Sequence, residues 1–163
     1  VCNVDDLMSD EELNNNTYVT AVSNLAKKEG SESLILCGKI EEELSQMDSS
    51  DQKEMLDDLN MKEPGLNRLA RQCYRLLGLS TYFTAGEKEI RAWTIPDGAL
   101  APTAAGVIHS DFQRGFICAE VYILEDLLLT GSKAKLKDAG KIRLEGKSYH
   151  VQDGDIMEFR FNV

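Results

Sequence analysis

The sequence predicts an α+β protein built from a piece of an α/β domain, a helical connector and a small β-rich domain. Over residues 1–47, short apolar runs are each followed by a helix-compatible stretch, which is the rhythm of strand–helix units. Helical periodicity fills the middle of the chain, and from Ser80 short β-type runs separated by turns take over. The predicted boundaries are residues 1–56, 57–79 and 80–163.

The first part is predicted to contain two strands, at residues 1–4 and 33–37, with a helix over residues 17–29 between them. That helix places Tyr18, Val22 and Leu25 on one apolar face, and Gly30 follows as its C-terminal stop. Residues 40–47 are predicted to form a second helix.

Residues 50–79, which include the connector, are predicted to be helical, with a break at Glu63-Pro64-Gly65 because proline lacks an amide donor. Its second helix ends at Gly78. One side of that helix is apolar, and Arg68, Arg71 and Arg75 are interpreted as a solvated face.

The last part is predicted to open with a hairpin of residues 80–85 and 88–95, joined by a turn at 85–87. A helix over 102–109 and a strand over 116–123 follow. The remaining predicted elements are a hairpin of residues 141–145 and 149–151 around Gly146-Lys147, and a final strand over 156–161.

Charge is unevenly distributed along the chain. The formal net charge is −10, which argues against a protein that coats nucleic acid non-specifically. Residues 1–79 hold 16 acidic and 8 basic residues, whereas residues 80–163 hold 12 and 10. Residues 133–147 form a basic segment that either faces RNA phosphates or is a solvated loop. Its basic residues are Lys133, Lys135, Lys137, Lys141, Arg143 and Lys147.

The cysteines indicate a reducing compartment. Cys2, Cys37, Cys73 and Cys118 are 35 to 45 residues apart, with no C-x-x-C pair and no clustered histidines for a metal site. We therefore expect free thiols, no metal and a cytoplasmic location, with a disulfide as the minor alternative. No apolar run approaches the roughly 20 residues that span a bilayer, so no membrane partner is expected.

The two histidines carry no clear catalytic pattern. His109 lies near Asp111 and Arg114, which together form either a polar surface site or a simple cap. No serine or cysteine nucleophile with a plausible partner accompanies His109 or His150, so no catalytic residue is predicted.

Six short motifs lie at residues 81–86, 91–94, 108–112, 115–117, 145–147 and 152–155. Together they resemble the TGS domain of the YchF/Obg-like ribosome-binding ATPases, a family of the P-loop GTPase superfamily. The resemblance extends upstream through residues 63–67 to Asn3, and thus over nearly the whole chain. It implies that residues 80–163 form a β-grasp (ubiquitin-like) TGS domain and that residues 1–56 are the C-terminal piece of a P-loop α/β nucleotide-binding domain.

The resemblance also implies a longer parent protein that hydrolyses ATP or GTP with Mg²⁺ and binds the ribosome or ribosomal RNA. This chain would then be its C-terminal fragment. The P-loop pattern G-x-x-x-x-G-K-[ST] is absent from the 163 residues, and phosphoryl transfer depends on that loop. We therefore expect no hydrolysis and no cofactor for these residues alone.

The same resemblance implies a purine-base site at Asn3, Asp6, Cys37 and Gly38. Asn3-x-x-Asp6 falls where the family has its base-recognition motif, which ends in Glu and prefers adenine, whereas guanine-specific relatives use N-K-x-D. Here Asp6 holds the acidic position, but Val4 replaces the lysine. ATP is therefore the first expectation and GTP the second. Without the family resemblance, the Asn and Asp would instead be interpreted as a polar turn that bonds the local backbone.

Two functions remain open from the sequence. In one, the chain supplies part of the purine pocket and a ribosome- or RNA-facing module, with Arg114 and the basic segment as the contact residues. In the other, it is a stand-alone RNA- or protein-interaction module that does not bind nucleotide. They differ in whether Asn3 and Asp6 bind a purine without the P-loop.

Overall fold

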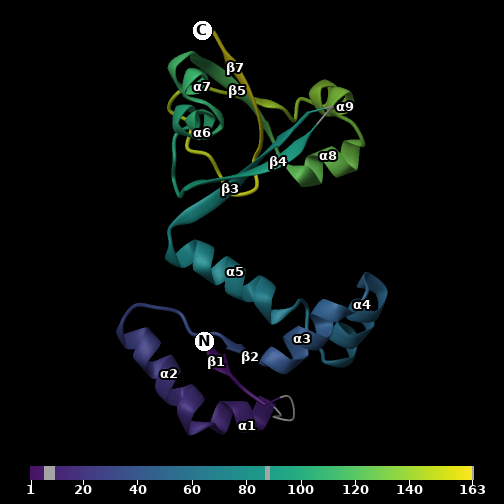
Figure 1. The fold of residues 1–163 in the computed structure, drawn as a ribbon. Coiled ribbons are helices and arrows are strands. Elements are labelled where there is room, and N and C mark those ends of the chain that lie inside the picture. The colour runs from purple at the N-terminus through teal and green to yellow at the C-terminus, as the bar shows by residue number, and fades with distance from the viewer. Residues whose placement is uncertain (6–9, 87–88, 163) are drawn as a thin grey trace. The chain divides into compact units, whose positions relative to one another are not determined.

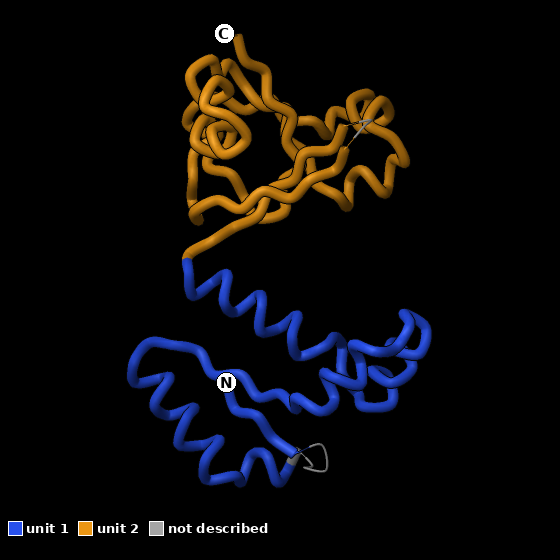
Figure 2. Tube along the Cα trace, viewed as in Figure 1, with its two compact units in different colours: residues 1–77 blue, residues 78–163 orange. Residues whose placement is uncertain are grey.

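The computed structural model describes residues 1–5, 10–86 and 89–162, and divides the chain into two compact units. Unit 1 spans residues 1–77 and unit 2 spans residues 78–163 (Figure 2). The mixture of helices and strands confirms the predicted α+β class. The helical connector lies within unit 1, and the predicted three-part division stays a prediction.

Unit 1 begins with a pair of parallel strands, β1 (Cys2–Asn3) and β2 (Ile35–Leu36). The chain between them contains α1 (Asp10–Asn15) and α2 (Thr17–Lys28). Helix α2 begins where the Asn16 side chain accepts hydrogen bonds from two backbone amides, and Gly30 follows it in a left-handed conformation with φ 67°. Both predicted strands and the predicted helix are therefore confirmed.

Three further helices complete unit 1, with the predicted break before the last of them. They are α3 (Gly38–Gln46), α4 (Ser49–Asp58) and α5 (Gly65–Leu76). The apolar side of α5 is largely exposed, since Leu66 and Leu76 keep 51% and 69% of their surface accessible, and Leu77, just after the helix, keeps 68%. The amphipathic pattern therefore indicated the helix correctly without indicating what covers it.

Unit 2 is a five-stranded sheet with helices on both faces (Figure 1). The strand order is β4-β3-β7-β5-β6, in which β3 and β7 are parallel and the other pairs are antiparallel. The strands are β3 (Leu79–Ala85), β4 (Ile90–Pro96), β5 (Phe116–Tyr122), β6 (Arg143–Glu145) and β7 (Ile156–Phe161). The helices are α6 (Ala101–Ile108), α7 (Ser110–Arg114), α8 (Leu124–Thr130) and α9 (Lys133–Asp138).

Each face of this sheet packs against its own helices because neighbouring residues of a strand point to opposite faces. Tyr82 and Met157 belong to the larger buried cluster, which includes residues of α6. Their neighbours Phe83 and Ile156 belong to a second cluster around Leu136 of α9. The two clusters hold the sheet between its two helical layers.

The predicted hairpin of residues 141–145 and 149–151 is wrong. Strand β6 pairs with β5 instead, with Arg143 opposite Val121. His150 forms an isolated bridge to Leu100, so residues 149–151 are not a strand of the sheet. A turn at Gly146 indicates a change of direction, but the free edge of β5 provides the backbone partners, and this long-range pairing is invisible in a local pattern.

Candidate functional site

The candidate base site lies at the carboxyl ends of β1 and β2. In the parallel register Asn3 lies opposite Leu36, so the segments that follow the two strands meet at one edge. The Asn3 Oδ1 atom accepts a hydrogen bond of 2.9 Å from the Gly38 backbone amide. The structure therefore brings together three of the predicted base-site positions, namely Asn3, Cys37 and Gly38. Asp6, the fourth, lies outside the described residues.

Gly38 permits this close approach. A Cβ atom at Gly38 would lie 3.3 Å from Asn3 Oδ1, which is a tight contact. Gly38 is also the first residue of α3, and Cys37 before it provides no side-chain cap. The Asn3 side chain thus satisfies an amide at the open end of α3 and fixes where that helix begins.

A buried glutamate links α3 to α5. Glu41 is 6% exposed, and its Oε1 and Oε2 atoms accept hydrogen bonds from the backbone amides of Gly65 at 2.7 Å and Leu66 at 3.0 Å. These are the first two amides of α5, which Pro64 leaves without a side-chain cap. Glu41 therefore caps α5 from a different helix, in a place where a carboxylate also meets the positive end of the helix dipole.

Arg68 provides a second link between α5 and the strands. Its Nη2 atom donates a 3.2 Å hydrogen bond to the Ile35 carbonyl of β2, while its Nε atom is buried without a hydrogen-bond partner. The interpretation of Arg68 as part of a solvated face is therefore wrong. Arg71 does lie on the surface, where it pairs with Glu63 at 2.6 Å.

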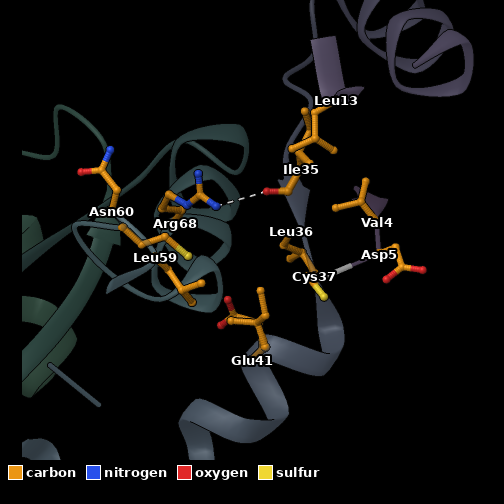
Figure 3. Close-up of a pocket in the computed structure, with 12 residues that line it drawn as sticks. Val4, Asp5, Leu13, Ile35, Leu36, Cys37, Glu41, Leu59, Asn60 and Arg68 are labelled. Atoms are coloured by element: carbon orange, nitrogen blue, oxygen red, sulfur yellow. Dashed lines mark hydrogen bonds between the residues drawn. The ribbon is translucent and has the colours of Figure 1, made fainter. Parts of the chain in front are cut away.

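Cys37, Glu41 and Arg68 line a pocket of about 390 Å³ (Figure 3). Asn3 and Gly38 are not among the residues that line it. Val4 and Asp5, which follow β1, lie on one side of it with Cys37, and Arg68 and Asn60 lie across from them. The pocket combines apolar walls with a few polar groups, which is the usual lining of a small-molecule site. Sequence reasoning missed Glu41 and Arg68, because a charged residue on a helix most often faces solvent.

The predicted RNA-facing residues lie in unit 2, and several form ion pairs within it. Lys133 pairs with Glu120 at 3.4 Å and also with Glu158, and Lys141 pairs with Asp126 at 3.5 Å.

Two arginines of the predicted set are engaged in the same way. Arg143 lies 3.2 Å from Asp155 and also donates to the Tyr149 hydroxyl, and Arg114 pairs with Asp111. Among the residues that the structure describes, the remaining members of the set, Lys135, Lys137 and Lys147, are exposed and form no ion pair.

The ion pairs shift the protonation equilibria of their members. Partial burial works to raise the pKa of Glu120, but hydrogen bonds from Arg160 and Lys133 outweigh it and hold that pKa below its ordinary value. Burial likewise opposes the charge of Lys133, whose pKa is nevertheless raised by Glu158 and Glu120. At Tyr149, burial together with the hydrogen bond to Asp155 raises the pKa to about 12.

Both histidines have structural contacts. The Nδ1 atom of His109 accepts a 3.2 Å hydrogen bond from the Asp111 amide and so caps α7. The Nδ1 atom of His150 lies 2.9 Å from the Gly98 carbonyl. All four cysteines are free. Within residues 1–5, 10–86 and 89–162, no group of three or more His, Cys, Asp or Glu side chains is placed to hold a metal ion.

No helix in the described part of the chain is both long and apolar enough to cross a membrane.

Comparison with known proteins identifies relatives that match more than nine-tenths of the chain. The Ribosome-binding ATPase YchF of Pasteurella multocida is 52% identical over 156 residues, which are 96% of this chain and 43% of that protein. The protein of the same name from Bacillus subtilis is 51% identical over 148 residues, or 91% of this chain and 40% of that protein. The chain thus spans less than half the length of these relatives.

Two solved structures share the fold. The Schizosaccharomyces pombe YchF GTPase superposes with a TM-score of 0.76 and 31% identity, covering 94% of this chain and 41% of that one. A GTP-binding protein from Pyrococcus horikoshii gives a TM-score of 0.62 at 16% identity, covering 96% and 43% respectively. At this lower identity the second match shows the fold alone.

The family model YchF-GTPase_C, described as a protein of unknown function (DUF933), matches residues 79–162 and so nearly all of unit 2. The predicted resemblance is confirmed, and the chain belongs to the YchF family.

Proposed function

We propose that this chain provides part of the purine-base pocket and a ribosome-facing module of a YchF-type P-loop ATPase located in the cytoplasm. The observation that carries the proposal is the 2.9 Å hydrogen bond between Asn3 Oδ1 and the Gly38 amide. It joins the two strand-end segments that the family resemblance assigns to the base, in a chain whose relatives are called ribosome-binding ATPases.

The triphosphate and Mg²⁺ belong, in this proposal, to residues outside the printed sequence. The 163 residues contain no P-loop pattern, and P-loop proteins hold phosphates mainly through the amides and lysine of that loop. The described residues also offer no metal-binding cluster, so no catalytic step is assigned to them. We accordingly expect the chain alone to bind nucleotide weakly and not to hydrolyse it.

Adenine is the preferred base in the proposal. Val4 stands where guanine-specific relatives carry the lysine that flanks the ring, and its side chain lines the pocket beside Cys37. An apolar side chain offers a contact surface to either purine but no charge to the guanine edge. Asp6 is the residue that could reverse this preference, because its carboxylate would accept hydrogen bonds from guanine donors.

Unit 2 is proposed to be a β-grasp TGS domain. In support, its first and last strands, β3 and β7, form a parallel pair at the centre of the sheet, with a helix packed on one face. Lys135, Lys137 and Lys147 are proposed to contact ribosomal RNA, because lysines without an internal partner can neutralise phosphates at little cost.

Calorimetric titration tests the nucleotide part of the proposal. The whole protein, the 163-residue chain and the Asn3→Ala variant of the whole protein would each be titrated with ATP and with GTP in the presence of Mg²⁺. We expect tighter ATP than GTP binding by the whole protein, and weakening by Asn3→Ala of about ten-fold, because one oriented polar group is lost. Asn24→Ala, on the exposed surface of α2, is the matched control.

Each outcome separates the alternatives. A GTP preference would show that Asp6 governs base choice and would overturn the adenine assignment. Equal affinities of Asn3→Ala and Asn24→Ala would remove Asn3 from the base site. No nucleotide binding by the whole protein would leave the stand-alone interaction module as the function.

Ribosome co-sedimentation over a salt series tests the RNA contact. Replacing Lys135, Lys137 and Lys147 together by Gln should weaken binding most at low salt and reduce the salt dependence. The control is the triple Gln variant of the exposed residues Lys27, Lys28 and Lys53 in unit 1, which removes the same charge. Equal losses in both variants would show a net-charge effect and refute the specific contact.

A further inference from the structure

An open apolar groove lies on one face of unit 2, between the ends of β3 and β4 and helix α8. Its volume is about 460 Å³. Figure 1 shows α8 beside β4 at the side of the sheet opposite α6 and α7. The apolar residues that line the groove include Phe83, Ala85, Ile90, Ile123, Leu124 and Ile156.

The floor of the groove is formed by one face of the β3–β4 pair. Ala85 lies opposite Ile90, and Phe83 lies opposite Ala92, so all four side chains project from the same side of the β3–β4 pair. Phe83 and Ala85 also pack on the small buried cluster around Leu136. Ile90, by contrast, keeps 77% of its surface exposed, so the groove is anchored at one end and open at the other.

Helix α8 forms the wall of the groove. Leu124 is 51% exposed, and Leu128, one helical turn later on the same side, is 72% exposed. Leu127 packs inward on the buried cluster and holds the helix in place. Ile90 and Leu124 are thus exposed apolar residues that line the groove, and Leu128 adds exposed apolar surface on the same side of α8 beyond the lining. Exposed apolar surface of this kind is typical of a protein interaction site.

The charge of the residues at the groove indicates which kind of partner can bind there. Among its described lining residues, the ionisable ones are Glu125 and Asp153, both acidic. Such a rim repels RNA phosphates and anionic lipid head groups. A second copy of the chain, with its formal net charge of −10, is also disfavoured. A basic partner is the complementary choice.

We propose that this groove binds an amphipathic, basic peptide segment of a partner protein. Apolar side chains at helical spacing would enter the groove between Ile90 and Leu124, and Lys or Arg side chains would face Glu125 and Asp153. This is the helix-in-groove mode of recognition, in which a few apolar anchors supply most of the affinity. The proposal depends neither on nucleotide binding nor on the lysines proposed to contact RNA.

An amide NMR titration of the chain tests it. The probe is a synthetic peptide with leucines at helical spacing and lysines at all other positions, compared with the same peptide carrying glutamate instead of lysine. We expect the lysine peptide to shift the amides of Phe83, Ile90 and Leu124 and to bind more tightly than the glutamate peptide. Leu124→Gln should weaken its binding about ten-fold, because an exposed anchor is lost without disturbing the core.

Two matched controls distinguish specific binding in the groove from non-specific binding elsewhere on the surface. Leu129→Gln removes a leucine of the same helix that is 85% exposed and does not line the groove, and should change affinity by less than about two-fold. Glu125→Gln should weaken binding, whereas Asp138→Asn on α9 should not. The proposal is overturned if Leu124→Gln and Leu129→Gln bind equally, or if the glutamate peptide binds as tightly. Self-association of the chain that Leu124→Gln abolishes would also overturn it, since a second copy would then occupy the groove.

Discussion

The Glu41→Gln substitution should destabilise unit 1 by removing the cap of α5. Both carboxylate oxygens of Glu41 accept backbone amides, at 2.7 Å from Gly65 and 3.0 Å from Leu66, and the side chain is buried. Glutamine keeps one acceptor but points an NH₂ group at the other amide, which leaves a buried donor unsatisfied.

The magnitude follows from this geometry. A hydrogen bond to a charged group contributes about 1.5–3 kcal/mol, and the carboxylate at the helix N-terminus adds about 0.3–1 kcal/mol. One of the two bonds survives in glutamine, so we expect a loss of about 2 kcal/mol. For a small unit whose urea m-value is about 1–2 kcal/mol/M, the unfolding midpoint should fall by about 1–2 M.

Urea unfolding followed by far-UV circular dichroism measures this loss. Trp93 is the single tryptophan of the chain and lies in unit 2, so its fluorescence reports on that unit separately. The control is Glu42→Gln, which removes an exposed carboxylate from the same helix and should change the free energy of unfolding by less than about 0.5 kcal/mol. If the Glu41 and Glu42 variants had the same midpoint, the capping role assigned to Glu41 would be refuted.

Two further predictions concern unit 2. Gly115→Ala should destabilise the unit by about 3 kcal/mol or more, because the new Cβ atom would lie 2.1 Å from the Asn162 carbonyl oxygen. Gly146→Ala, which has open space around it, is the control. Equal midpoints of the two variants in thermal unfolding would contradict the prediction. Lys133→Met should lower the free energy of unfolding by about 1 kcal/mol at pH 7. Glu120 and Glu158 lie directly opposite each other on β5 and β7 and would lose the cation that both contact, but solvent screening keeps the effect small. The folded pKa of Glu120 is held below its ordinary 4.5, so the stabilisation is present above about pH 4.5 and is lost as the pH falls through the folded pKa. The free energies of unfolding of the wild type and Lys133→Met should therefore converge in acid. A constant difference between them from pH 7 to pH 3 would argue against the ion-pair mechanism.

Local sequence patterns were sufficient for elements whose cause is local. The apolar face of residues 17–29 and the stop at Gly30 predicted α2, and the β-type run from Ser80 predicted β3. Helices α8 and α9 were missed because Leu127–Leu129 form an apolar run without periodicity and the lysines after it suggest a loop. Strand β6 was paired wrongly for the related reason that its partner, β5, lies more than 20 residues earlier in the chain.

At the candidate site, too, some residues were predicted from the sequence and others were found only in the structure. Asn3 and Gly38 were predicted together through the family resemblance, and the parallel pairing of β1 with β2 brings the two positions to one edge. Glu41 and Arg68 were not predicted, because nothing in their neighbourhood distinguishes a capping glutamate or a half-buried arginine from a solvated helix face. Likewise, the basic segment was recognised, but the pairing of Lys133 with Glu120 and Glu158 depends on strands far along the chain.

By itself, the sequence determined the α+β class, the break before α5, the family and the positions that follow the strands, since these depend on periodicity, on residues such as Pro64 and on short motifs. The tertiary structure alone decided which charges are used internally, which glutamate caps α5 and where apolar side chains stay exposed as a groove. The physical reason is that hydrogen bonds, ion pairs and burial are properties of groups brought together from distant parts of the chain, and a local pattern records each group without its partner.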